Sequence, residues 1–407
     1  MNTNSYRNYM NLIILYIKDH GLIRTMNDAF CYIFFRIITI FPFAKNIFKW
    51  LTRLHKGLTH KNINICFFIG GGFGDFLIFA NYVWYFLKYF NDSRIKIDVY
   101  FAGGFGTSKS LFEEGKLIRK LYKRENEYIY QSYDVFFELS RYPRIKYFNK
   151  SKIIKKKSLP LFEYIQICKK FEYENPRFFC GAENDGQSAI FSLYAGQKRL
   201  QQPDIYRFFG IKESYYYPLF INANEDSFLK SFHLTSKKFI TMHRGCDANY
   251  PTHVKMWSVE NYGILAKMIK LEFPEIIIVQ YGISEKRCPP IENVDVNLVG
   301  KTSMEEVKIL LKNSLVHIDS DGGMVHLRHA LHGGPSIAMY GPNWQPFFGY
   351  SENINITGTG CSHFCDWLTN DWMIHCARNC DVPPCMASIT PEQIMEAFRK
   401  FMNSGVK

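Results

Sequence analysis

The chain has 407 residues, of which 47% are hydrophobic, and its formal net charge is +13. This composition excludes a chain that is disordered throughout, and the length fits two or three domains. The positive charge favours anionic partners such as an acidic membrane surface, a phosphorylated glycolipid or nucleic acid. Nucleic acid ranks last among them because no nucleic-acid-binding motif accompanies the charge.

Residues 1–60 are basic and have the pattern of helices, which predicts a helical extension. Their most apolar stretch, residues 29–44, carries Arg36 in its middle and is shorter than the ~20 residues that span a bilayer. The extension either lies in a membrane surface or packs against the protein. Because the first residues lack the cleavage site of a secretory signal, we expect a cytoplasmic protein, peripheral at the inner membrane in the first case.

Residues 61–230 begin with the pattern of a Rossmann-like domain. An apolar run at 63–69 predicts a strand that is buried on both faces, and a glycine-rich turn then leads into a helix predicted over 76–90. Two further strands are expected, at 95–102 and 133–139. This alternation of strands and helices predicts a parallel α/β sheet.

The basic run 141–157 holds eight Lys or Arg residues and no carboxylate. Such runs are usually a solvated face. The alternative is a patch that steers a phosphorylated acceptor, with Lys155, Lys156 and Lys157 as its candidates.

A second α/β series occupies residues 231–390. Capping boxes of Ser303 with Glu306 and of Thr390 with Gln393 mark the starts of two helices. We predict strands at 239–243, 275–282, 315–321 and 335–341, helices at 258–273, 302–314 and 323–333, and a terminal helix within 391–407. Two such series predict two Rossmann-like domains facing across a cleft, where ligands bind beyond the carboxyl ends of the strands.

The turn after residue 320 has the features of a phosphate site. Asp321, Gly322 and Gly323 join a strand to a helix, and Met324 and His326 follow in its first turns. Glycine lets the backbone approach a ligand, and a helix N-terminus offers unpaired N–H groups with a partial positive charge. The simpler interpretation is a tight structural turn.

Residues 298–350 resemble glycosyltransferase family 9, the ADP-heptose:lipopolysaccharide heptosyltransferases. The family's turn of aspartate, hydroxyl residue and glycine, followed by His-Leu, is matched from Asp321 to His326, although Gly322 replaces the hydroxyl residue. Residues 243–262 are similar to the family's Lys-x-Trp segment, which implies that Lys255 contacts the donor. The resemblance implies a GT-B fold.

The resemblance also implies a role for Asp75. The pair Gly74-Asp75 matches the family's Gly-Asp, whose aspartate is placed as the catalytic base. An acceptor hydroxyl is a poor nucleophile, and a carboxylate that takes its proton typically contributes about 10²–10⁴-fold in rate. The residue pattern alone also allows Asp75 to be a helix cap.

The implied activity is an inverting glycosyl transfer, with ADP-heptose as donor and a lipopolysaccharide core or other surface glycan as acceptor. It needs no cofactor for the chemistry. Another nucleotide sugar or a protein acceptor, as in the autotransporter heptosyltransferases, is the alternative. A non-catalytic membrane-associated scaffold is the alternative of another class. A dehydrogenase is disfavoured because "GGGFGDF" lacks the third glycine of a dinucleotide turn.

Five cysteines crowd into the C-terminal region: Cys361, Cys365, Cys376, Cys380 and Cys385. Four thiolates of the five would suit a structural zinc or iron ion in tetrahedral geometry. Free thiols or disulfides are the alternatives. The cluster is similar in place, though not in spacing, to the iron-binding cysteines of the autotransporter heptosyltransferases.

Overall fold

The computed structural model separates the chain into two compact units, residues 1–61 and 62–407. The predicted helical extension lies outside the described residues. No helix in the described part of the chain is both long and apolar enough to cross a bilayer. The structure describes residues 62–405 except 102–105, 107–108, 113–116, 124–126, 140–141, 156–157, 177–214, 246–253, 363–364 and 366–373.

The first sheet has the strand order β3-β2-β1-β4-β5. Its middle strand β1 is fully apolar on one face and nearly so on the other, as the sequence predicts for a strand covered by helices. The neighbours of β1 run parallel to it, and only β5 runs antiparallel at the edge, within the residues described. The strands are β1 (Ile63–Ile69), β2 (Ile95–Phe101), β3 (Lys120–Tyr122), β4 (Val135–Leu139) and β5 (Pro143–Phe148).

Helices of the same half follow these strands in the order expected of an α/β fold. Helix α4 follows β1 directly, and its Tyr82 and Phe86 pack against Phe67 of that strand. The helices are α4 (Phe73–Phe90), the 3-10 helix η1 (Glu127–Ser132), α6 (Lys150–Lys155) and α7 (Leu159–Glu174).

The basic run folds into β5 and α6 and is not a uniformly solvated face. Arg144 pairs with Glu172 at 2.6 Å, Lys146 with Glu138 at 2.8 Å and Lys152 with Asp134 at 2.7 Å. The sequence did not reveal these pairs because their carboxylates lie in other segments of the chain. Of the predicted steering residues, Lys155 ends α6, whereas Lys156 and Lys157 lie outside the described residues.

The second sheet has the order β11-β10-β9-β6-β7-β8, and all its described pairings are parallel. The four strands predicted for this half are confirmed, whereas β8 and β11 were missed because they are short and half-buried. The strands are β6 (Phe239–His243), β7 (Ile277–Gly282), β8 (Val296–Val299), β9 (His317–Ser320), β10 (Ser336–Tyr340) and β11 (Ile354–Thr357).

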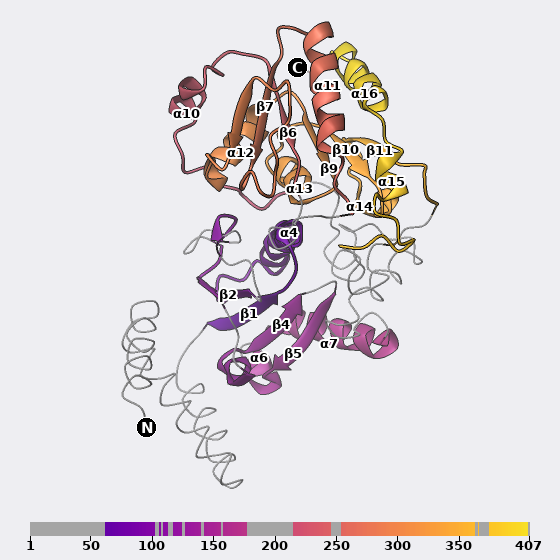
Figure 1. Ribbon diagram of the computed structural model, residues 1–407. Coiled ribbons are helices and arrows are strands. Elements are labelled where there is room, and N and C mark those ends of the chain that lie inside the picture. The colour runs from indigo at the N-terminus through magenta and orange to yellow at the C-terminus, as the bar shows by residue number, and fades with distance from the viewer. Residues whose placement is uncertain are drawn as a thin grey trace, which may run out of the picture. The chain divides into compact units, whose positions relative to one another are not determined.

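Capping boxes begin two helices of this half, as predicted. Ser303 and Glu306 cap α12, and Thr390 and Gln393 cap the terminal helix α16. In Figure 1, α16 runs beside α11, where Phe273 and Phe398 meet edge to face at 5.3 Å. The helices are α10 (Glu225–Ser231), α11 (Val259–Glu272), α12 (Met304–Asn313), α13 (Gly323–Ala330), α14 (Gln345–Phe348), α15 (Pro384–Ala387) and α16 (Pro391–Asn403).

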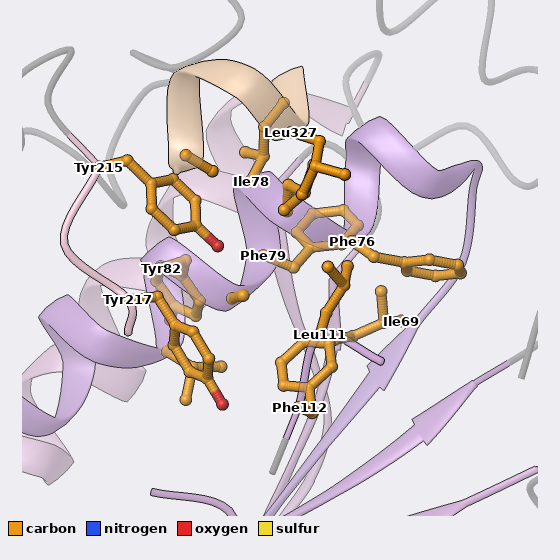
Figure 2. Close-up of a cluster of buried hydrophobic side chains, with 14 of the residues drawn as sticks. Ile69, Phe76, Ile78, Phe79, Tyr82, Leu111, Phe112, Tyr215, Tyr217 and Leu327 are labelled. Atoms are coloured by element: carbon orange, nitrogen blue, oxygen red, sulfur yellow. The ribbon is translucent and has the colours of Figure 1, made fainter. Parts of the chain in front are cut away.

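One cluster of buried side chains joins the two sheets. Figure 2 shows Phe76 and Phe79 of α4 beside Leu327 of α13, with Tyr215 and Tyr217 from the segment between the two halves against them. All five side chains are almost fully buried. The shared core therefore holds the start of α4 against the start of α13, which places the two predicted glycine turns next to each other.

Candidate active site

Helix α4 begins at Phe73, three residues earlier than predicted, and Asp75 lies in its first turn. The Oδ2 atom of Asp75 accepts a hydrogen bond of 2.7 Å from the amide of Gly72, the N-cap residue. Gly71 has φ +113°, and a Cβ on it would lie 2.5 Å from the same Oδ2 atom. Glycine at this position thus permits both the left-handed turn and the close approach of the carboxylate.

The first turns of α4 and α13 touch. A Cβ on Gly74 would lie 2.6 Å from Cδ2 of His326, and a Cβ on Gly323 would lie 3.0 Å from Cδ1 of Phe73. Only glycine lets the two helices meet this closely. The contact brings together Gly74, Asp75, Gly323 and His326, which the sequence predicted separately, and we call these four residues the junction.

His326 is 7% exposed and is held by a tyrosine that the sequence did not single out. Its Nδ1 atom lies 2.5 Å from the hydroxyl of Tyr350. Met324, predicted with the same turn, packs against the shared core. Tyr350 could not be predicted because it is separated from His326 by 24 residues and belongs to no motif.

Lys255 and Asp321 lie close together at the carboxyl ends of the second sheet's strands. The Nζ atom of Lys255 is 3.8 Å from Oδ2 of Asp321 and 5.7 Å from the ring centroid of Phe348. Asn343 donates a hydrogen bond to the same Asp321 oxygen. The Asp321 amide donates to the carbonyl of Met339 at 2.9 Å, which ties the turn to β10. The Asp321 carboxylate is therefore placed to orient Lys255.

Behind this site lies a buried polar network that sequence reasoning missed. Nδ1 of His243 is 2.8 Å from Oδ2 of Asp319, and the Nε2 atom of His317 is 3.5 Å from that oxygen. Nε2 of His243 lies 4.0 Å from Sγ of Cys288. The sequence contained one signal for this network. His243, His317 and Asp319 are polar residues in the predicted strands 239–243 and 315–321, where apolar residues are expected.

The pKa values of His243, Asp319 and Cys288 in this network differ from their ordinary values. Burial lowers the pKa of His243, but the charge of Asp319 and its hydrogen bond overcome burial and raise the pKa to about 10. Burial raises the pKa of Asp319, yet the His243 charge brings it below its ordinary value. The pKa of Cys288 is raised by burial, but its hydrogen bond with His243 and the His243 charge lower it overall. His243 therefore carries a proton at neutral pH.

The five C-terminal cysteines are thiols, and three of them act electrostatically on Cys385. Burial, together with the charges of the Cys365, Cys361 and Cys376 thiols, raises the pKa of Cys385 to about 11. Cys380 instead donates to a backbone carbonyl at 3.6 Å. In the part of the chain that the structure describes, no three potential ligands are spaced as a metal site requires. Sulfur donors suit zinc or iron.

A cavity of about 560 Å³ lies away from the junction. It is bounded by the segment 216–225 and by the ends of α12 and α13, and Lys312 and His332 are among its lining residues. None of the predicted site residues lines it. The junction, where a carboxylate meets a helix N-terminus, is chemically better suited to transfer from a phosphorylated donor.

The sequence profile of glycosyltransferase family 9 (heptosyltransferase) matches residues 222–365. This range contains Lys255 and the turn from Asp321 to His326. A search of curated proteins found no matching sequence.

Solved structures with the same fold include heptosyltransferases of low sequence identity. ADP-heptose lps heptosyltransferase II of E. coli is 16% identical, over 83% of this chain and 98% of its own, with a TM-score of 0.50. The dodecameric iron-containing heptosyltransferase TibC in complex with ADP-D-beta-D-heptose is 11% identical, over 84% of this chain and 77% of its own, with a TM-score of 0.56. TibC from enterotoxigenic E. coli H10407 is 12% identical, over 85% of this chain and 77% of its own, with a TM-score of 0.54. These similarities confirm the predicted GT-B fold.

Proposed function

We propose that the chain is an inverting glycosyltransferase that transfers heptose from ADP-heptose, because residues 222–365 match the profile of glycosyltransferase family 9 (heptosyltransferase). The observation that carries this proposal is the contact between Gly74 and His326, which joins the carboxylate turn to the glycine turn of the family 9 domain. The structure of TibC in complex with ADP-D-beta-D-heptose, which has a similar fold, supports this choice of donor.

In the proposed mechanism, the acceptor hydroxyl attacks the anomeric carbon of the donor while Asp75 takes its proton. The bond from the anomeric carbon to the nucleoside diphosphate breaks, and the diphosphate leaves with the bonding electron pair. Lys255 and the amides of the 322–326 turn balance the developing negative charge. Direct displacement inverts the configuration at the anomeric carbon. The residues Gly74, Asp321, Gly322, Gly323, Met324 and His326 form the proposed donor side.

The proposed acceptor is a lipopolysaccharide core or another surface glycan at the cytoplasmic face of the inner membrane. The formal net charge of +13 supports an anionic acceptor or surface. Lys155, Lys156 and Lys157 are the proposed steering residues. A protein acceptor is the second candidate, because a cluster of cysteines in the C-terminal sequence accompanies a fold similar to that of an iron-containing heptosyltransferase.

The donor proposal is tested by a panel of nucleotide sugars. Binding and transfer are measured for ADP-heptose, other ADP-sugars, and UDP- and GDP-sugars, with glycan and protein acceptors offered in parallel. We expect ADP-heptose to bind most tightly and to be consumed only when an acceptor is present. Binding of another nucleotide sugar in its place would overturn the donor, and binding of none would overturn the proposal.

We further propose that Cys361, Cys365, Cys376 and Cys385 hold a structural zinc or iron ion. The chemistry of the transfer does not involve this ion. Elemental analysis of protein purified without oxygen should find about one metal ion per chain. The variant Cys385→Ser should lose the ion and thermal stability, whereas the matched variant Cys380→Ser should keep both. Metal-free wild-type protein of unchanged stability would contradict the proposal.

A further inference from the structure

Tyr350 is fixed on two sides by histidines of helix α13. Its side chain is 3% exposed, and its hydroxyl lies 2.5 Å from Nδ1 of His326. Its ring stacks on the ring of His329, with centroids 3.7 Å apart and planes 16° from parallel. His329 is in turn paired with Glu352 through its own Nδ1 atom. The position of the Tyr350 hydroxyl is therefore set by packing as well as by its hydrogen bond.

The direction of the hydrogen bond between Tyr350 and His326 depends on the tautomer of the imidazole. A phenol keeps its proton at neutral pH, since its ordinary pKa is about 10. His326 lies in the first turns of α13, where the partial positive charge of the helix end disfavours an imidazolium. A neutral imidazole has one protonated and one unprotonated nitrogen. If the Tyr350 O–H donates to Nδ1, the proton of His326 is on Nε2.

The edge of His326 that bears Nε2 faces the start of α4. A Cβ on Gly74 would lie 2.6 Å from Cδ2 and 3.3 Å from Nε2 of His326. Gly74 directly precedes Asp75, the proposed base. The Nε2–H group is thus at the junction, on the side opposite to the bond with Tyr350.

We infer that Tyr350 is a positioning residue that holds His326 in the neutral Nε2–H form, so that the imidazole donates a hydrogen bond to a diphosphate oxygen of the nucleotide sugar. This inference rests on the proposed function. A neutral donor at this point strengthens its bond as negative charge grows on the departing diphosphate. It also takes no proton from the acceptor, which leaves that step to Asp75.

The test combines a spectroscopic readout with kinetics. Protein with ¹⁵N-labelled histidine is studied by long-range ¹H–¹⁵N NMR, and the His326 signals are assigned with the variant His326→Gln. We expect the Nε2–H pattern in the wild type and a mixture of both tautomers in Tyr350→Phe. In the same variant kcat should fall on the order of tenfold, as for other orienting partners, while KM for the donor stays nearly unchanged.

Tyr340→Phe is the matched control. Tyr340 is also fully buried, and its hydroxyl has no hydrogen-bond partner among the described residues. This variant should leave both the tautomer and kcat unchanged. An unchanged tautomer in Tyr350→Phe would overturn the inference whatever the activity, and so would a changed tautomer with unchanged kcat. If the tautomer changes but no nucleotide sugar is a substrate of the wild type, the tautomer assignment stands and the proposed function falls.

Discussion

At Asp75, one carboxylate both caps a helix and lies at the junction. Its Oδ2 atom receives the Gly72 amide at 2.7 Å, so the capping and catalytic interpretations of this residue are compatible. The left-handed turn at Gly71 allows this geometry. A carboxylate that is already held in place by its own helix loses less conformational entropy when an acceptor binds. Such a fixed position suits a general base.

His243 gives a pH-dependent prediction at the residue scale. Its pKa is raised from 6.5 to about 10 in the folded protein. The stabilisation by its pair with Asp319 is therefore full below pH 6.5 and is lost as the pH rises through about 10. The variant His243→Gln leaves a buried carboxylate without its cation, so it should lower the free energy of unfolding by about 3–5 kcal/mol at about pH 6.

The measurement is denaturant unfolding of His243→Gln and wild type at about pH 6 and about pH 10. His233→Gln, at a surface position of the same domain, is the control and should differ little from wild type at both values. A stability loss in His243→Gln that is equal at the two pH values would show that the histidine is not paired as a cation.

At the scale of elements, the contact of α4 with α13 depends on Gly74. A Cβ added there would lie 2.6 Å from the His326 ring, so one of the two helices must move. Gly74→Ala should therefore lower the free energy of unfolding by about 1–3 kcal/mol, the usual cost of overpacking, and displace His326. Thermal unfolding measures the first effect, and the His326 NMR signals report the second.

Gly322→Ala is the control for that experiment, because a Cβ there meets only a carbonyl oxygen at 3.6 Å and its backbone is extended. Its stability should stay within about 0.5 kcal/mol of the wild type. Equal stability losses in the two variants would contradict the close contact between the helices.

Sequence patterns were sufficient to predict those helices and strands whose signals lie within the element itself. A continuous apolar run predicted β1, and the capping boxes predicted the starts of α12 and α16. Strand β5 was missed because its basic side chains are neutralised by carboxylates that lie elsewhere in the chain. The partners of His326 and Asp321, namely Tyr350 and Asn343, depend on tertiary contacts that no motif encodes.

At the scale of the whole folded unit, Lys308 of α12 joins segments that are distant in sequence. Its side chain is fully buried, and its Nζ atom donates to the carbonyls of Ser110 at 2.7 Å and Phe220 at 2.9 Å. It also pairs with Glu305 at 2.7 Å. One ammonium thus connects the first α/β half, the segment between the halves and the second α/β half.

Lys308→Met should lower the free energy of unfolding by about 1–3 kcal/mol, because it removes the cation beside Glu305 and the buried donor to the carbonyls of Ser110 and Phe220. Lys312→Met is the control one turn further along the helix. Lys312 pairs with Glu225 at 3.3 Å at the surface, and its loss should cost at most about 1 kcal/mol. A similar effect of the two variants in urea unfolding would contradict the connecting role of Lys308.

The most direct test of the account as a whole is the transfer rate of Asp75→Asn. Asparagine keeps an oxygen that accepts the Gly72 amide, so the start of α4 should be preserved. Single-turnover transfer should fall by about 10²–10⁴-fold, while the Kd for the nucleotide sugar and the melting temperature stay unchanged. Transfer at the wild-type rate would contradict the assignment of Asp75 as the base and with it the junction as the catalytic site.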